Sequence, residues 1–260
     1  MGVMIARRSQ SPENPALSTS DQTGGDTSEY KNLSELWEYA EIEGGISITK
    51  YHGNDDRLVL PEELDGKRVP EIGDGSVWDY VLHDYGETSD IEEIELPEGI
   101  TRLGYLSFAE LSRLETVNIP ESVTSFGGSL FRGCSAIESM TLPEGITEID
   151  TTFYECTSLS GFTIPKSVER LYATFENCGK LTSIVIPGNV TSIDAAFENC
   201  TALTSLTIPD SVTKIDPAQI CGCLIREMFT IMSSLPSFLT SGLDKLKCPV
   251  GGRGIFFGNL

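Results

Sequence analysis

The sequence predicts a β-rich α/β solenoid, in which the chain repeats one turn many times and the strands of successive turns stack in parallel. Three observations predict it: prolines recur every 22 or 23 residues, two short alternating apolar stretches keep the same interval, and a Phe-x-x-Cys segment follows them in several units. One unit of this kind cannot cover its own apolar residues. Several units must therefore stack to form a continuous core.

The prolines define the repeat. Aligned on them, the unit reads I-x-[IL]-P-x-x-[VI]-T-x-[IL]-x-x-x-F-x-x-C-x-x-L-x-x, as in IVIPGNVTSID (184–194) and LTIPDSVTKID (206–216). A fixed period of this length is the sequence signature of a repeat architecture. The prolines are spaced 23, 23, 22, 22 and 22 residues apart, at Pro97, Pro120, Pro143, Pro165, Pro187 and Pro209.

Each unit is predicted to hold two strands and a return segment. Leu206 and Ile208 alternate with polar residues in one first stretch, and alternation rich in Val, Ile and Thr is typical of strands. Proline suits the bend between the strands because no ladder donor is needed there. The return segment DAAFENCTAL (194–203) is predicted as a short helical turn that buries Phe197 and Leu203.

These residues resemble the BspA-like class of leucine-rich repeats, whose 22–23-residue units carry this Pro, Phe and Cys pattern. The segment ISITKYHGNDDRLVLPEELDGKRVPEIG (46–73) is similar to the opening of that family, a strand, a turn and a strand. The resemblance covers about residues 37–231. It implies a right-handed coil that binds other molecules, commonly on secreted or surface-exposed bacterial proteins and on some protist surfaces, and it implies no catalytic residues.

Composition and periodicity divide the chain around the repeats. The N-terminal segment is rich in Ser, Thr, Pro, Gly and Asn, and no secretory signal is expected in it. A capping helix is predicted over 233–248, where Leu and Phe recur at helical spacing. The predicted parts are a disordered segment (1–30), a solenoid (31–231) made of an N-terminal cap with an irregular first repeat (31–96) and regular repeats (97–231), and a C-terminal cap and tail (232–260).

The charge argues against two classes of partner. Asp+Glu 39 against Lys+Arg 18 give a formal net charge of −21. Nucleic acids and anionic membranes require clustered Lys and Arg, so neither is expected as a partner. No apolar run approaches the roughly 20 residues of a membrane helix, so membrane insertion is not expected either. A solvated acidic surface accounts for the charge without any partner.

The repeated cysteines are predicted to form a buried structural ladder of thiols. Parallel stacking would place them about 5 Å apart, too extended a row for one tetrahedral zinc ion. Stacked side chains also point in parallel rather than toward each other, which disfavours disulfides. Buried free Cys packs as a small hydrophobe; metal and redox roles are the alternatives. The ladder comprises Phe131, Phe153, Phe175, Phe197, Cys134, Cys156, Cys178 and Cys200.

Three further cysteines have two interpretations. Cys221 and Cys223 lie in a decayed repeat, where they compete for one ladder position. Alternatively, one of them forms a disulfide with Cys248.

Signatures of catalysis are missing. The chain has only two histidines, His52 and His83, and both fall in acidic loops. No catalytic residue, cofactor or metal is expected. The acidic loops do not follow the spacing of a calcium-binding loop; a solvated loop is predicted, with weak calcium binding as the alternative.

Function is expected instead on exposed surfaces, first on the outward faces of the first strands. These positions are small and uncharged, so a partner could approach the sheet closely. The alternative is that such residues are simply tolerated on a solvated strand, where Thr fits well. The predicted partner-binding positions are Thr116, Asn118, Ser139, Thr141, Gly161, Thr163, Ser183, Val185, Ser205 and Thr207.

The second expected surface is the insertion at 78–90, which breaks the repeat. It places Trp78, Tyr80 and Tyr85 among acidic residues, and aromatics on loops are typical interface anchors. The alternative is that Trp78 and Tyr80 replace a missing core phenylalanine. Val77 stands at the expected spacing for that phenylalanine, which favours the binding role.

The expected protein is a monomeric, non-enzymatic binding module with a protein or glycan partner. The resemblance implies adhesion at a cell surface or in the extracellular space. The free thiols and the missing signal favour the alternative, a cytoplasmic scaffold or recognition protein.

Overall fold

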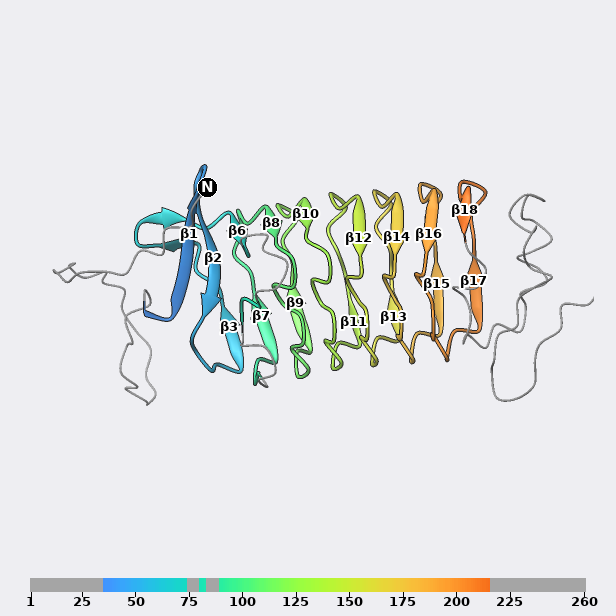
Figure 1. The fold of residues 1–260 in the computed structure, drawn as a ribbon, viewed down its shortest axis with the longest axis horizontal. Coiled ribbons are helices and arrows are strands. Elements are labelled where there is room, and N and C mark those ends of the chain that lie inside the picture. Colours follow the sequence, from blue (N-terminus) through green and yellow to red (C-terminus); the bar gives the residue numbers. More distant parts are fainter. Residues whose placement is uncertain (1–34, 74–79, 83–88, 216–260) are drawn as a thin grey trace, which may run out of the picture.

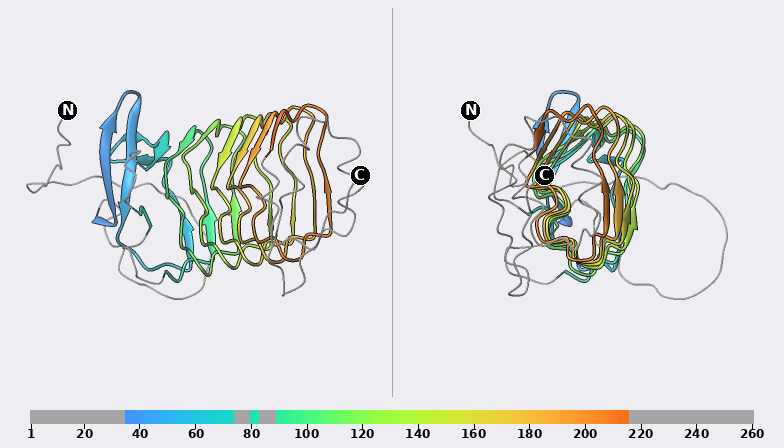
Figure 2. Two further views of the ribbon diagram at one scale, coloured as in Figure 1. Left: turned by 45° about the vertical axis from the view of Figure 1, so that its right-hand side comes forward. Right: turned by 90° about the vertical axis from the view of Figure 1, so that its right-hand side faces the viewer.

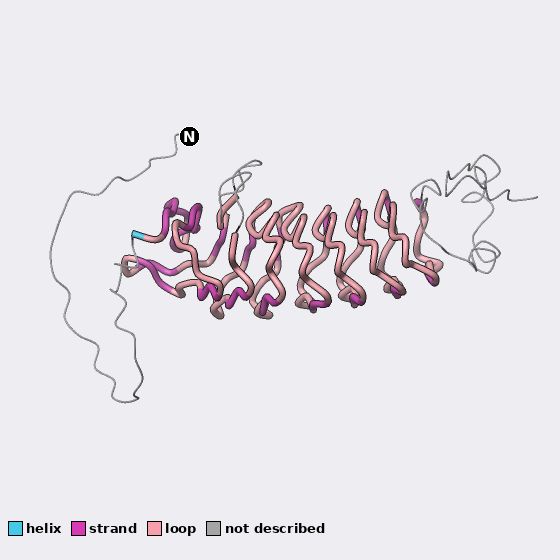
Figure 3. Tube along the Cα trace, turned by 90° about the horizontal axis from the view of Figure 1, so that it is seen from below, coloured by secondary structure: helices cyan, strands magenta, loops and turns pink. Residues whose placement is uncertain are grey.

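The computed structural model describes residues 35–73, 80–82 and 89–215, which form one elongated stack of coils (Figure 1). Seen from below, the coils repeat as similar loops along the long axis (Figure 3). The predicted solenoid with parallel stacked strands is confirmed. The segment 1–30, the helix predicted over 233–248 and the cysteines beyond residue 215 lie outside the described residues.

An antiparallel hairpin closes the N-terminal end of the stack, and its first strand lies before the segment 46–73 for which a strand, a turn and a strand were predicted. Strand β1 (Trp37–Ile42) pairs with β2 (Gly45–Tyr51). The rings of Trp37 and Tyr51 are both buried, with their centroids 4.5 Å apart. The hairpin therefore covers apolar residues that no earlier coil could cover.

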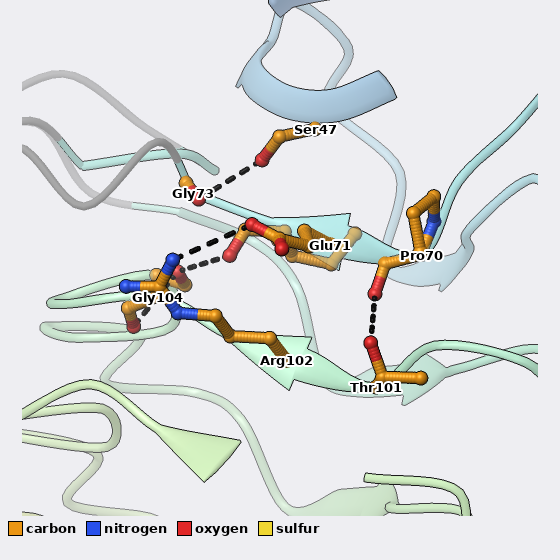
Figure 4. Close-up of polar contacts among 9 residues, drawn as sticks. Ser47, Pro70, Glu71, Gly73, Thr101, Arg102 and Gly104 are labelled. Atoms are coloured by element: carbon orange, nitrogen blue, oxygen red, sulfur yellow. Dashed lines mark hydrogen bonds and ion pairs between the residues drawn. The ribbon is translucent and has the colours of Figure 1, made fainter. Parts of the chain in front are cut away.

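The hairpin joins the stack through β6 (Glu71–Ile72), which pairs in parallel with β2. The buried Ser47 hydroxyl donates to the Gly73 carbonyl, at 2.9 Å (Figure 4). A short antiparallel pair, β4 (Glu63–Leu64) and β5 (Lys67–Arg68), precedes β6.

The coils contribute strands to two rows, separated in Figure 1 into a lower and an upper one. The lower row, here the first-strand wall, comprises β3 (Arg57–Val59), β7 (Glu93–Glu95), β9 (Thr116–Asn118), β11 (Ser139–Met140), β13 (Gly161–Phe162), β15 (Ser183–Val185) and β17 (Ser205–Thr207). The upper row, the second-strand wall, comprises β6, β8 (Arg102–Leu103), β10 (Ser125–Phe126), β12 (Glu148–Asp150), β14 (Arg170–Tyr172), β16 (Ser192–Asp194) and β18 (Lys214–Ile215).

Strands that pair within each wall do so in parallel, and equivalent residues lie side by side. Leu171 of β14, for example, pairs with Ile193 of β16. Seen end-on, the coils superimpose closely (Figure 2). Because the register is kept from coil to coil, each sequence position becomes a continuous column along the molecule.

The core lies between the two walls and the return segments. The rings of the predicted Phe ladder are buried, and successive centroids are 5.6–5.8 Å apart. The ladder begins one coil earlier than predicted, with Phe108, whose ring centroid lies 5.6 Å from that of Phe131. Leu111, fully buried, takes the Cys position in that coil. The sequence prediction missed this coil because it looked for Phe and Cys together.

The predicted helical turns in the return segments are wrong. No α-helix occurs in the described residues; the return segments are hydrogen-bonded turns. In the segment 194–203, Ala195 (φ 52°) and Asn199 (φ 57°) are left-handed, which interrupts a right-handed helix. Several backbone N–H groups bond to the next coil instead, as Phe175 does to the Ala196 carbonyl at 2.9 Å. None of these residues forms a helix suited to crossing a membrane.

The coils come in two lengths, and the structure shows where the extra residue lies. The long coils, residues 97–142, have 23 residues each, and the short coils, residues 143–208, have 22. In a long coil, the inward residue of the second strand (Phe126) lies three positions before the next left-handed residue (Ser129). In a short coil, the same two positions (Ile149 and Thr151) are two apart. The extra residue therefore follows the second strand.

Glycine is required at this point because neighbouring coils approach closely. A Cβ on Gly127 would lie 2.2 Å from the Tyr105 backbone nitrogen, and one on Gly104 would lie 2.9 Å from the Ile72 carbonyl oxygen. The Gly104 N–H bonds that same Ile72 oxygen, at 2.6 Å. Figure 4 shows this part of the second-strand wall, where Arg102 also pairs with Glu71 (3.5 Å).

Candidate binding surface

The repeated thiols are buried and hydrogen-bonded. All four side chains of the predicted Cys ladder are inaccessible to solvent and unpaired by disulfides. Each Sγ donates to the carbonyl oxygen of the ladder phenylalanine in the preceding coil, as Cys178 does to Phe153 at 3.1 Å. The other bonds are Cys134 to Phe108 (3.0 Å), Cys156 to Phe131 (3.2 Å) and Cys200 to Phe175 (3.0 Å). The thiols therefore act as donors that join the coils.

Burial also makes these thiols unreactive. Desolvation raises the pKa of Cys178 to about 12 and raises the pKa values of Cys134 and Cys156 well above the ordinary range. The thiolate is the form that attacks substrates and binds metals, so a neutral buried thiol does neither. No group of three or more His, Cys, Asp or Glu in the described ranges is placed to hold a metal ion. His52 Nε2 lies 2.8 Å from Glu38 Oε1.

The first-strand wall carries the predicted small-residue columns on its outside. The ten side chains and glycine positions named above are exposed, and the residues between them point inward. Register places Ser183 beside Ser205 and Val185 beside Thr207. Val185 is 74% exposed, which makes it the most exposed of the large apolar side chains described. The orientation is as expected, and the binding role stays a prediction.

Toward the N-terminus the same wall changes from neutral to charged. Arg57 pairs with both Glu93 (3.5 Å) and Glu95 (2.9 Å) on the neighbouring strand. Beside them, Arg113 pairs with Asp90 (2.7 Å) and with Glu92. All these side chains are substantially exposed, so the pairs contribute little stability. They set the charge pattern of the surface.

The insertion at 78–90 is described only in part. Trp78, Tyr85 and Val77 lie outside the described residues, so the structure does not test their roles. Tyr80 is half-buried, and its carbonyl accepts from Lys50 Nζ at 3.3 Å.

Two residues that the sequence analysis did not single out anchor this insertion. Val81 and Leu82 are 1% and 3% exposed, and the Val81 carbonyl accepts from the Tyr51 N–H at 2.7 Å. At the other end, Ser89 is buried and its hydroxyl accepts from the Ile91 N–H. Val81 and Leu82 are adjacent apolar residues in an otherwise acidic stretch, and this pattern could have indicated that they are buried.

The second-strand wall presents an aromatic and acidic row that sequence reasoning also missed. Asp150, Tyr172 and Asp194 occupy equivalent positions in three successive coils. Tyr172 is 54% exposed, unusually high for a large aromatic in this molecule. In the sequence, these residues stand two positions after the first residue of each second strand (Glu148, Arg170 and Ser192), so alternation along the strand could have indicated that they point outward.

Comparison with known proteins identifies the same repeat. The family model described as BspA type leucine rich repeat region matches residues 84–195 and 172–241, in six copies. No curated protein gives a significant match.

Several solved structures share the fold. A leucine rich cell surface protein from Faecalibacterium prausnitzii is 25% identical, with a TM-score of 0.60 over 79% of this chain and 54% of that one. Leucine-rich repeat proteins from Bacteroides ovatus (24% identity, TM-score 0.51, 72% and 55% covered) and Eubacterium ventriosum (22%, 0.51, 72% and 50%) show the same architecture.

The chain thus spans about half the length of these three solved proteins. The matched region contains the regular coils, with their prolines, ring ladder and thiol ladder. The chain belongs to the BspA-type leucine-rich-repeat family.

Proposed function

We propose that this chain is a non-enzymatic binding module of a cell-surface or secreted protein. It recognises a protein or glycan partner through the outward columns of the first-strand wall, together with the aromatic residues of the 78–90 insertion. It acts as a monomer and uses no cofactor.

The observation that carries the proposal is the continuous, exposed run of small uncharged side chains from β9 to β17. Small side chains let a partner's backbone or sugar ring approach the strands closely. The parallel register repeats the same contact at each coil, so weak contacts add along one extended ligand. Within the insertion, Val81, Leu82 and Ser89 are buried, so this part of it is attached to the folded stack.

Two observations favour the cell surface over the cytoplasm. The Faecalibacterium prausnitzii relative is described as a cell surface protein. The four ladder thiols are also fully buried and bonded, so they do not need a reducing compartment to stay free. The thiol argument for a cytoplasmic scaffold is thereby removed for these residues.

The first test is a binding screen of the full chain against extracellular-matrix proteins and a glycan array, followed by variants of the wall. Thr141→Arg with Thr163→Arg places two large charged groups on the columns and is expected to weaken binding at least tenfold. Thr157→Arg with Thr201→Arg, at two exposed threonines on return segments, is the control that adds the same charge. Equal binding by both variants would exclude the first-strand wall as the contact surface.

The insertion has its own test. Replacing Trp78, Tyr80 and Tyr85 with Ala is expected to weaken binding while leaving the unfolding transition unchanged. If the triple variant unfolds, the rings belong to the core and the insertion is structural.

A further inference from the structure

The second-strand wall changes its outer surface where the long coils end. In the long coils, the position after the second strand is glycine, at Gly104 and Gly127. In the short coils, the equivalent position carries Asp150, Tyr172 and Asp194, whose neighbours are fixed by strand pairing. One wall thus has a glycine part and a part with large functional groups.

At the boundary, a tyrosine from the long coils extends the row. A Cβ built on Gly128 would lie 3.2 Å from the Tyr105 ring and 3.3 Å from Asp150 Oδ2. The ring and the carboxylate therefore converge on one point above Gly128, which the glycine leaves open. On the other side of Asp150, strand pairing places Tyr172 at about 4.8 Å between backbones.

The result is a carboxylate between two tyrosine residues, followed by a second carboxylate on Asp194. The other charged groups on the same strands, Glu148 and Arg170, pair with each other. Asp150 Oδ1 accepts from Thr151 Oγ1 at 2.7 Å, which holds the carboxylate in place. Neither interaction places a cation on the Asp150 carboxylate.

We propose that Tyr105, Asp150 and Tyr172 form a site for an arginine or lysine side chain presented by a partner protein. A guanidinium or ammonium group is attracted to the negative face of an aromatic ring. It also makes charge-assisted hydrogen bonds to carboxylates. The net charge of −21 draws the same kind of group from a distance.

Charge decides between this partner and a glycan. A neutral sugar stacks on tyrosine but gains nothing from the long-range field, and it must displace water from the Asp150 carboxylate. A cation gains from the tyrosine rings and the Asp150 carboxylate together. The site rests on the proposed binding function and adds a second contact surface, on the wall that the first proposal does not use.

The test uses the full chain and two fluorescent probes of equal length, one with six arginines and one in which citrulline replaces each arginine. Binding is measured by anisotropy in about 150 mM salt, where charges more than about 8 Å apart are screened. The arginine probe is expected to bind and the citrulline probe not to bind. Tyr172→Leu, which keeps the charge and most of the apolar area, should weaken binding about two- to fivefold.

A charge-matched pair separates the site from the net charge. Asp150→Asn should weaken binding by a similar factor, whereas Glu138→Gln, which removes one exposed carboxylate near the first-strand wall, should change it less than twofold. Equal effects of Asp150→Asn and Glu138→Gln, or no effect of Tyr172→Leu, would overturn the site.

Two further outcomes would each contradict the arginine or lysine site. Glycan binding that is lost in Tyr172→Leu would show a glycan site and contradict the proposal. If Thr141→Arg with Thr163→Arg abolishes partner binding while Tyr172→Leu does not affect the arginine probe, the binding function stands and this site alone is wrong.

Discussion

The long coils and the short coils build the same core with different second-strand surfaces. Both place successive phenylalanine rings 5.6–5.8 Å apart between centroids and keep the parallel register of the walls. The long coils place one extra residue after the second strand, where backbone meets backbone and only glycine fits. The short coils place side chains there, and Tyr172 is exposed to solvent.

The two coil lengths show how a solenoid accommodates a change of repeat length. The extra residue follows the second strand, so the inward positions of both strands stay in register. The strand pairing of the second-strand wall is interrupted at this boundary, because β10 and β12 belong to different sheets. The core continues across the interruption through Phe131 and Phe153, whose rings are stacked 5.8 Å apart.

The largest expected effect comes from removing a ladder ring. Phe153 contacts three rings, those of Phe131, Phe162 and Phe175, whereas within the described ranges Phe108 contacts one. Phe153→Ala is expected to lower the free energy of unfolding by about 3–5 kcal/mol. Phe108→Ala should cost about 1 kcal/mol less, because fewer ring pairs are lost.

Urea unfolding followed by circular dichroism measures both variants. An equal loss, or a larger loss for Phe108→Ala, would show that the long coils are packed as tightly as the short ones.

A smaller effect is expected at the glycines of the long coils. Gly127→Ala forces a Cβ against the backbone of Tyr105 and Gly104, at 2.2 Å and 2.4 Å, and should cost about 1–3 kcal/mol. The control is Gly161→Ala in a short coil, where a Cβ meets nothing within 4 Å. That variant should change stability by less than about 0.5 kcal/mol. Thermal unfolding of the two variants side by side decides the matter, and a neutral Gly127→Ala would contradict the close approach.

The smallest effect is expected at a ladder thiol and depends on pH. Cys178→Ala should cost about 1–2 kcal/mol at pH 7.5, through lost packing and a lost hydrogen bond. In the folded protein, burial raises the pKa of Cys178 to about 12, above the roughly 8.5 of an unfolded thiol. The folded state therefore binds more protons between these values, and the stability contributed by the thiol is present below about pH 8.5 and lost as pH rises toward 12.

The difference between wild type and Cys178→Ala should accordingly shrink at pH 10. Urea unfolding at pH 7.5 and pH 10 tests this, with Leu111→Ala as the control that removes the equivalent position of a long coil without removing a titrating group. A difference that stays constant with pH would mean that the thiol is not desolvated.

Much of the architecture was predictable because it repeats. The prolines set the coil length, and the buried Phe and Cys were visible at one position in successive units. The helical turns were predicted wrongly because alanine is a good helix former, and nothing local signals that Ala195 is left-handed. Their conformation follows from hydrogen bonds to the next coil, which are tertiary contacts.

Of the two candidate surfaces, one was predictable from the sequence and the other was not. The small-residue columns on β9 to β17 followed from strand alternation alone, because successive side chains of a strand point to opposite faces. The row of Tyr105, Asp150 and Tyr172 did not, because Tyr105 reaches it only across the Gly128 position of the neighbouring coil. The anchoring of the insertion by Val81 and Leu82 likewise depends on contacts distant in sequence.

The repeat, its length, the inward and outward positions of each strand and the acidic surface all follow from the amino-acid sequence alone. These are properties of one unit, and periodicity copies them from coil to coil. Four features required the folded structure: the left-handed return turns, the place of the extra residue, the hydrogen bonds of the thiols and the groups that meet on the second-strand wall. Each of those depends on the distance and register between two coils, which no single unit contains.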